Sequence, residues 1–242
     1  MQELVITKQI FQKLRSNDQT LIFAGYIEGC KKVRLFSDGN DYALLCKVGS
    51  EVECCLSGSN VSFADKVCAL PCLKGQVKFC AVGDELFDHI SARFGSEGVS
   101  RCGYYVYDGT PLTHVVTHKI EPIDPKFAKA VSDGTFYHAD LDEIRHCLSL
   151  RPSACITENG KPVCWCLVHR EGSLGMLFTL PEYRHKGLAL DVMTALCQML
   201  IDIGQKPFAY IVDGNVASIS LAAKYNLKQI GHASYFLCTW VH

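Results

Sequence analysis

The chain of 242 residues is 48% apolar and 20% charged, a composition typical of a folded globular protein. This composition excludes a disordered chain, a collagen and a coiled-coil rod. The formal net charge is -1, and neither half carries the basic field that a nucleic-acid backbone requires, so we expect no nucleic-acid partner.

The N-terminal sequence favours a cytoplasmic protein. Met1 is followed by an early acid, Glu3, and by no long apolar run, which is not the pattern of a secretory signal peptide. No stretch approaches the ~20 apolar residues of a membrane span, so we expect no membrane partner. We expect a monomer or a homodimer.

Fourteen cysteines stand out in this composition. They are scattered without a CxxC pair, and the two tight Cys/His pairs typical of a tetrahedral zinc site are missing from the sequence. Buried free thiols in a reducing compartment are the favoured interpretation, with a redox or metal role as the alternative. We therefore expect no metal.

The first 120 residues are predicted to form a strand-rich α/β domain. It opens with a helix whose apolar residues Ile10, Phe11 and Leu14 share one face. A meander of three strands follows, and then a strand, a helix and a further strand. The predicted ranges are 8–15 for the first helix, 33–37, 42–48 and 52–56 for the meander, and 76–82, 84–94 and 104–107 for the last three elements.

Residues 121–242 form the second predicted domain. The segment from Pro122 to about Gly134 is interpreted as the connector, and a helix begins near Asp140 and ends before Pro152. Three meandering strands follow, with a hairpin turn at Asn159-Gly160. The predicted strands are 153–157, 163–169, 173–180, 207–213 and 228–237, and the later helices are 188–203 and 215–225.

The long helix after residue 187 is the most periodic segment of the chain. Its apolar residues recur at helical spacing from Leu188 to Ile203, and Gly204 is placed to end it. Its opposite face carries the polar residues Asp191, Thr194, Gln198 and Asp202.

The joint between the third strand and this helix carries the strongest chemical signal. The first-turn amides of a helix have no intrahelical partner and form an anion site. Gly187 and Ala189 are small, so a diphosphate can approach the backbone, and Arg184 and Lys186 add positive charge. Taken alone, this pattern also fits a helix start with two small packing residues.

The pattern Arg184-x-x-Gly187-x-Ala189 resembles the Arg/Gln-x-x-Gly-x-Gly/Ala signature of the GNAT superfamily of acyl-CoA-dependent N-acyltransferases. The turn Asp213-Gly214-Asn215 and the helix after it are similar to the second motif of that superfamily. The segment from Thr179 to Arg184 looks like the pyrophosphate loop of the glycine N-acyltransferase-like branch. The hairpin around Trp165 and the turn Gly204-x-x-Pro207 also match that branch, over roughly residues 140–240.

This resemblance implies an α/β (α+β) fold with a GNAT-like mixed, mostly antiparallel sheet flanked by helices. It also implies that the strand-rich N-terminal half is a degenerate GNAT-like half-domain. The implied function is transfer of acetyl from acetyl-CoA, or of another acyl group from its acyl-CoA, to the amine of a small molecule or amino acid. Transfer would occur by direct attack in a ternary complex. The alternative is a catalytically inactive acyl-CoA-binding regulatory module.

The resemblance further implies which residues bind the acyl-CoA. The diphosphate would lie on the loop amides, and the pantetheine arm would pair with the third strand like an added strand. A backbone amide near Thr179 would stabilise the oxyanion. The predicted donor-binding residues are Phe178, Thr179, Leu180, Arg184, His185, Lys186, Gly187, Leu188, Ala189, Asn215 and Ser218.

The predicted catalytic residues are Tyr225, Glu171 and Ser173, and here the sequence departs from the pattern of the relatives. Ala222 stands where many relatives carry a general-acid tyrosine, and Tyr225 lies one turn further on a similar face; its alternative role is packing. Ser173 stands where the branch carries a catalytic glutamate. Glu171 and His169 share its face if the strand is regular, and their alternative role is that of solvated hairpin residues.

His114 and His118 are four residues apart. The β-branched residues between them favour a strand, in which the two rings would lie too far apart for easy chelation of one metal.

Overall fold

The computed structural model describes residues 1–134 and 139–240. The chain divides into two compact units, and each unit combines segments that are distant in sequence. The first unit contains Met1–Tyr104, Tyr210–Gly214 and Ile230–His242, and the second contains Tyr105–Ala209 and Asn215–Gln229. The units do not follow the domain boundary placed after residue 120, which stays a prediction, because the chain passes between them several times.

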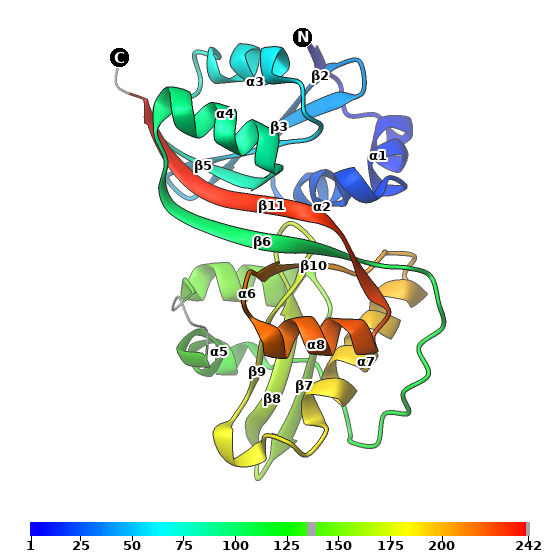
Figure 1. Ribbon diagram of the computed structural model, residues 1–242. Coiled ribbons are helices and arrows are strands. Elements are labelled where there is room, and N and C mark those ends of the chain that lie inside the picture. The colour runs from blue at the N-terminus through cyan, green and yellow to red at the C-terminus, as the bar shows by residue number, and fades with distance from the viewer. Residues whose placement is uncertain (135–138, 241–242) are drawn as a thin grey trace. The chain divides into compact units, whose positions relative to one another are not determined.

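The strands of the first unit belong to one large sheet. They are β1 (Gln2–Leu4), β2 (Val33–Asp38), β3 (Asp41–Val48), β4 (Glu51–Leu56), β5 (Gly75–Val82), β6 (Glu97–Tyr107), β10 (Phe208–Val212) and β11 (Leu227–Trp240). Their order across the sheet is β1-β2-β3-β4-β5-β11-β6-β10 (Figure 1). The predicted meander is present as antiparallel β2, β3 and β4. β4 then pairs in parallel with β5, so the sheet is mixed but mostly antiparallel.

The helices of the first unit include two that the sequence pattern did not predict. They are α1 (Lys8–Arg15), α2 (Leu21–Gly29), α3 (Val61–Cys68) and α4 (Asp84–Phe94), with a short 3₁₀ turn, η1 (Asp18–Thr20), before α2. The predictions of α1 and α4 are confirmed. α2 was missed because it is buried from Leu21 to Tyr26 and so lacks the polar face that reveals an amphipathic helix.

The core of the first unit lies between the sheet and the pair α3 and α4. Alternate residues along β3, β4 and β5 point to this side, as the period of a strand requires. They pack against apolar side chains of the two helices, chiefly Phe63, Val67, Leu86 and Ile90.

The second unit is built on an antiparallel sheet of β7 (Ser153–Glu158), β8 (Lys161–Val168) and β9 (Leu174–Thr179), in that order. The predicted hairpin turn is present, since Asn159 and Gly160 both have positive φ, 52° and 73°. These positions suit Asn and Gly because other residues rarely adopt the left-handed region.

Helices cover both faces of this smaller sheet (Figure 1). α5 (Ala128–Gly134) and α6 (Leu141–Leu150) pack on the face that carries Trp165 and Leu167. α7 (Leu188–Asp202) packs on β7, β8 and β9 from the other side, and α8 (Val216–Lys224) follows β10. η2 (Pro125–Phe127) and α5 occupy the segment interpreted as a connector, so that interpretation is wrong for residues 125–134.

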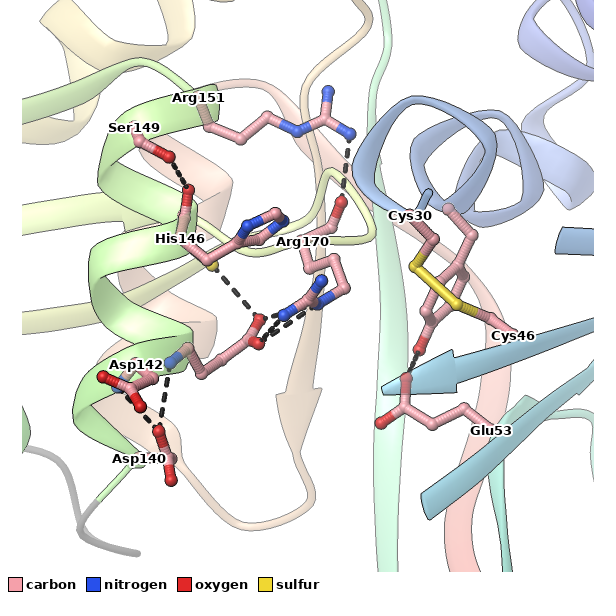
Figure 2. Close-up of polar contacts among 12 residues, drawn as sticks. Cys30, Cys46, Glu53, Asp140, Asp142, His146, Ser149, Arg151 and Arg170 are labelled. Atoms are coloured by element: carbon pink, nitrogen blue, oxygen red, sulfur yellow. Dashed lines mark hydrogen bonds and ion pairs between the residues drawn. A yellow bond between two sulfur atoms is a disulfide. The ribbon is translucent and has the colours of Figure 1, made fainter. Parts of the chain in front are cut away.

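Most of the cysteines are buried thiols, but one pair is not. Cys30 and Cys46 form a disulfide between the end of α2 and β3 (Figure 2), so the interpretation of these two as free thiols is wrong. Among the free cysteines of the described residues, Cys72 is exposed and the others are buried. Burial raises the pKa of Cys164 to about 11 and that of Cys197 to about 12, which keeps both protonated at neutral pH.

None of the helices in the described residues has both the length and the apolar character needed to cross a membrane.

Candidate functional site

β9 is one of the two edge strands of the smaller sheet, and it contains a bulge. The pairing with β8 shifts register between Trp165 and Leu167, so that two residues of β9 lie opposite Cys166. Met176, one of the two, has a positive φ of 53°. A bulge interrupts the hydrogen-bond ladder and is common next to active sites. The bulge was not predicted, because register across two strands is not visible in one strand's sequence.

The end of β9 has a main-chain edge that no other described strand pairs with. Phe178 and Thr179 are half-buried, and the three-stranded sheet that the structure describes has no further strand beside β9. Leu180 donates its amide to Val163 O at 2.9 Å, which keeps it on β8. An exposed strand edge pairs well with an extended ligand that carries amide groups.

The loop after β9 lies open to solvent and turns sharply into α7. Its first residues form a short 3₁₀ turn, η3 (Pro181–Tyr183). Arg184, His185 and Lys186 are exposed. Arg184 donates from Nε to Thr179 O at 3.1 Å and lies over the Phe178 ring, which fixes the base of the loop.

The start of α7 has the features of an anion site. Gly187 precedes the helix with a φ of 83°, a conformation that requires glycine here, and no side chain caps the helix at this end. The amides of Leu188 and Ala189 lie in the first turn, where the helix provides no partner for them. The structure therefore joins uncapped amides to the positive side chains of Arg184 and Lys186.

The predicted residues of α8 occupy the start of that helix. Asn215 is its N-cap and accepts from Ser218 N at 3.1 Å, as a capping asparagine does. Asn215 is exposed and Ser218 is half-buried.

Tyr225 directly follows α8 and reaches the start of α7. Its hydroxyl donates to Ala189 O at 3.3 Å, and only 1% of the residue is exposed. Burial raises the pKa of this phenol far above its ordinary value, with smaller contributions from nearby thiols and from Asp191. The structure thus brings the candidate acid beside the predicted donor loop, in an enclosed position.

Glu171 and Ser173 lie in the tight turn between β8 and β9. His169 N donates to Ser173 O, Gly172 N donates to His169 O, and Gly172 has a φ of 91°. The alternation that would place residues 169, 171 and 173 on one face therefore does not apply. Instead, Ser173 is buried and donates from Oγ to Glu171 Oε1 at 2.5 Å.

The turn that carries Glu171 and the loop that carries Arg184 lie at opposite ends of β9. A strand of six residues spans about 20 Å at about 3.3 Å per residue. An extended ligand of that length, bound at the α7 end, would therefore reach the Glu171 end.

A charged cluster that the sequence did not reveal adjoins this turn (Figure 2). Arg170 donates two Nε contacts to the Glu143 carboxylate of α6, at 3.2 and 3.1 Å, and a further contact from Nη2. Arg151 donates from Nη2 to Arg170 O at 3.0 Å. Burial opposes ionisation of Glu143, but the Arg170 guanidinium outweighs it and holds the pKa of Glu143 below its usual range. The cluster ties α6 to the turn before β9.

In the described residues, no group of three or more His, Cys, Asp or Glu side chains is arranged to hold a metal ion.

Comparison with known proteins supports the resemblance. A segment of 118 residues is 30% identical to glycine N-acyltransferase of Pongo abelii and also to that of Homo sapiens. Residues 154–241 match the model of the FR47-like protein family. The C-terminal region is an FR47/GNAT-family domain. The match to the Pongo abelii enzyme covers 46% of this chain and 38% of that enzyme, so the chain spans well under half the length of these relatives.

The GNAT fold extends beyond this domain. A solved Drosophila protein superposes with a TM-score of 0.75 at 14% identity, covering 98% of each chain. A GCN5-related N-acetyltransferase-like protein from Streptococcus suis superposes with a TM-score of 0.56 at 15% identity, covering 96% of this chain and 98% of its own. Both the predicted fold class and the predicted family resemblance are confirmed.

Proposed function

We propose that the protein is an acyl-CoA-dependent N-acyltransferase that transfers an acyl group, most simply acetyl, to the amine of a small molecule or amino acid. The observation that carries this proposal is the run from the free edge of β9, through the positive loop, to the uncapped start of α7. The FR47/GNAT-family match and the glycine N-acyltransferase relatives support it. The expectation of a cytoplasmic monomer or homodimer accompanies this proposal.

The donor is proposed to bind along β9 and α7. The amides from Arg184 to Ala189 would hold the diphosphate, with Arg184 and Lys186 supplying charge. The main chain of Phe178, Thr179 and Leu180 would pair with the amides of the pantetheine arm. His185, Asn215 and Ser218 complete the proposed donor site.

The reaction needs three further functions from this chain. A base takes a proton from the acceptor ammonium, and Glu171 is our candidate, held by its bond from Ser173. The amine then attacks the thioester carbonyl, and a main-chain amide of β9 near the bulge or near Thr179 would stabilise the oxyanion. The carbon–sulfur bond breaks, and Tyr225 is the candidate acid that returns a proton to the leaving thiolate.

A second candidate function is a catalytically inactive acyl-CoA-binding module with a regulatory role. Two observations favour it. Tyr225 is buried and its hydroxyl donates to Ala189 O. The buried Ser173 stands where the glycine N-acyltransferase-like branch carries glutamate. Both functions require acyl-CoA binding and differ in turnover.

Titration calorimetry with acetyl-CoA and with CoA tests the shared part of the two proposals. Absence of binding at millimolar concentration would contradict both.

Thiol release from acetyl-CoA across a panel of amines then separates the two functions. Turnover that falls in Glu171→Gln or Tyr225→Phe, but not in the exposed control Glu85→Gln, supports the enzyme. Binding without turnover on any amine supports the regulatory module.

A further inference from the structure

A buried carboxylate lies in the first turn of α7, next to the proposed donor amides. Asp191 belongs to the face of α7 that the periodic pattern marks as polar, yet only 2% of the residue is exposed. Its carboxylate accepts hydrogen bonds from the segment His114–His118. That segment forms neither helix nor strand, so the predicted strand there is wrong.

The segment His114–His118 gives five hydrogen bonds to Asp191. His114 Nε2 contacts Oδ1 at 2.5 Å, and His118 Nδ1 contacts Oδ2 at 2.7 Å. Thr117 donates its amide and its hydroxyl to Oδ2, at 2.9 and 3.0 Å, and the His118 amide donates at 2.9 Å. An ionised carboxylate only accepts, so both rings present N–H to it. The two histidines, four residues apart, thus converge on one carboxylate.

The chain just before this segment is held at a second point, near Tyr225. Asn226, the next residue, donates from Nδ2 to Thr110 O at 3.1 Å and to Pro111 O at 3.3 Å. Tyr225 in turn donates to Ala189 O in the first turn of α7. The contacts therefore form a closed ring. It runs from α7 through Tyr225 and Asn226, along residues 110–118, and back to α7 through Asp191.

This arrangement has a consequence for an anionic ligand. An acidic side chain in the first turn of a helix is attracted to the same free amides that bind anions. Here the segment His114–His118 supplies five hydrogen bonds to Asp191, so its carboxylate is already engaged by that segment. Burial opposes ionisation of Asp191, but the bonds from the His114 and His118 side chains and from the amides of His118 and Thr117 outweigh it and hold its pKa well below the usual range.

We propose that Asp191 is a positioning residue of the acyl-donor site, which clamps His114–His118 onto the first turn of α7 and so fixes that turn in the geometry that receives the diphosphate. This inference rests on the proposed function, because it assigns the clamp to the same donor site. In this proposal Asp191 contacts neither the acyl donor nor the acceptor amine. It acts through the segment His114–His118 and the first turn of α7.

The test is the variant Asp191→Asn, which keeps the size of the side chain but presents an amide N–H to a set of donors. We expect the KM and the Kd for acetyl-CoA to rise about tenfold while kcat at saturating donor stays within about twofold, because binding geometry and not chemistry is changed. Trypsin should also cut faster after the exposed Lys119, which follows the clamped segment. The control is Asp202→Asn, at the exposed far end of the same helix, with unchanged KM.

A second series keeps the test decisive if Asp191→Asn does not fold. His114→Gln retains an N–H near the position of Nε2 and should behave like the wild type, whereas His114→Ala should raise the KM for acetyl-CoA several-fold. A purely structural role would lower the melting temperature and leave KM unchanged. KM and Kd within twofold of the wild type in Asp191→Asn, or in His114→Ala where the first variant does not fold, would overturn the inference alone. Wild-type protein that binds no acyl-CoA would overturn the proposed function and this inference with it.

Discussion

The two halves of the sequence repeat one order of elements but differ at one strand edge. In the first half, the meander β2, β3, β4 is followed by α3, β5, α4 and β6, and in the second half β7, β8, β9 is followed by α7, β10, α8 and β11. β4 pairs in parallel with β5, from Val52 opposite Val77 to Cys55 opposite Cys80. β9 instead ends its sheet in the described residues. A ligand that adds itself as a strand finds an unpaired edge on β9, whereas this edge of β4 is already paired.

The helix that follows each meander differs in the same sense. Asn60 caps α3 by accepting from Phe63 N at 3.0 Å, so one of the free amides at the start of that helix already has a partner. α7 follows Gly187 and has no side-chain cap. The loop before α3 contains no basic residue, whereas Arg184 and Lys186 precede α7. Of the two loops compared, the one between β9 and α7 combines a free strand edge, an uncapped helix and positive charge, and the proposed donor site depends on all three.

The largest effect is expected from a variant that obstructs the start of α7. Gly187→Val places a β-branched residue at a φ of 83° and puts a side chain where the diphosphate would lie, so we expect acetyl-CoA affinity to fall at least about 100-fold. Titration calorimetry measures it. The matched control is Gly160→Val, at a φ of 73° in the β7–β8 turn, with similar strain but no donor contact. Equal loss of affinity in both variants would show that strain, and not the anion site, is responsible.

The charge of Asp191, in the second unit, can be tested by the pH dependence of stability. Asp191→Asn should reduce the free energy of unfolding by about 2 kcal/mol at neutral pH, because the donors of His114–His118 lose their charged acceptor. Asp191 has a lower pKa in the folded chain than in the unfolded chain, so its contribution is complete above the unfolded pKa of about 3.9 and declines as pH falls toward the folded value.

The difference between the wild type and Asp191→Asn, measured by urea denaturation, should therefore shrink as the pH falls below about 4. A difference that stays the same or grows between about pH 4 and about pH 2 would contradict the assignment of a charged Asp191.

The variant Arg184→Ala tests how much the loop charge contributes to acetyl-CoA binding. We expect acetyl-CoA affinity to fall about tenfold, and to become less sensitive to salt, because the guanidinium supplies a charge-assisted contact to the diphosphate. Calorimetry at two ionic strengths measures both effects. Lys74→Ala, an exposed residue of the first unit, is the control and should leave affinity unchanged.

The smallest expected effect concerns the first unit. Asn60→Ala removes the cap of α3 and should cost about 1 kcal/mol of stability in thermal or urea unfolding. It should leave acetyl-CoA affinity as in the wild type, because no donor is proposed to bind there. A second binding event that appears in this variant would mean that the cap alone closes a site in the first unit.

Local pattern predicted most of the elements and the loop of the donor site. The spacing of Leu188, Val192 and Leu196 gave the long helix, and the Asn159-Gly160 pair gave the hairpin turn, because these signals lie within a few residues of one another. α2 was not predicted because it has no polar face to reveal the helical period. The catalytic positions were harder, since the turn at Gly172 removes the strand alternation on which Glu171 and Ser173 were placed together.

Features that depend on distant residues were not visible in the sequence. Asp191 lies on the polar face of its helix by periodicity, but it is buried and bonded to the segment His114–His118, more than seventy residues earlier in the chain. The disulfide joins Cys30 to Cys46, two of many cysteines with no distinguishing spacing. The bulge at Met176 requires knowledge of the register with β8.

The assignment of the donor site to β9 and α7 is tested most directly by the stoichiometry of acetyl-CoA binding to the wild-type chain, measured by titration calorimetry. We expect one acetyl-CoA per chain, and no detectable binding event in Gly187→Val. Two equivalents per chain, or one equivalent that persists in Gly187→Val, would contradict the assignment of the donor site to β9 and α7.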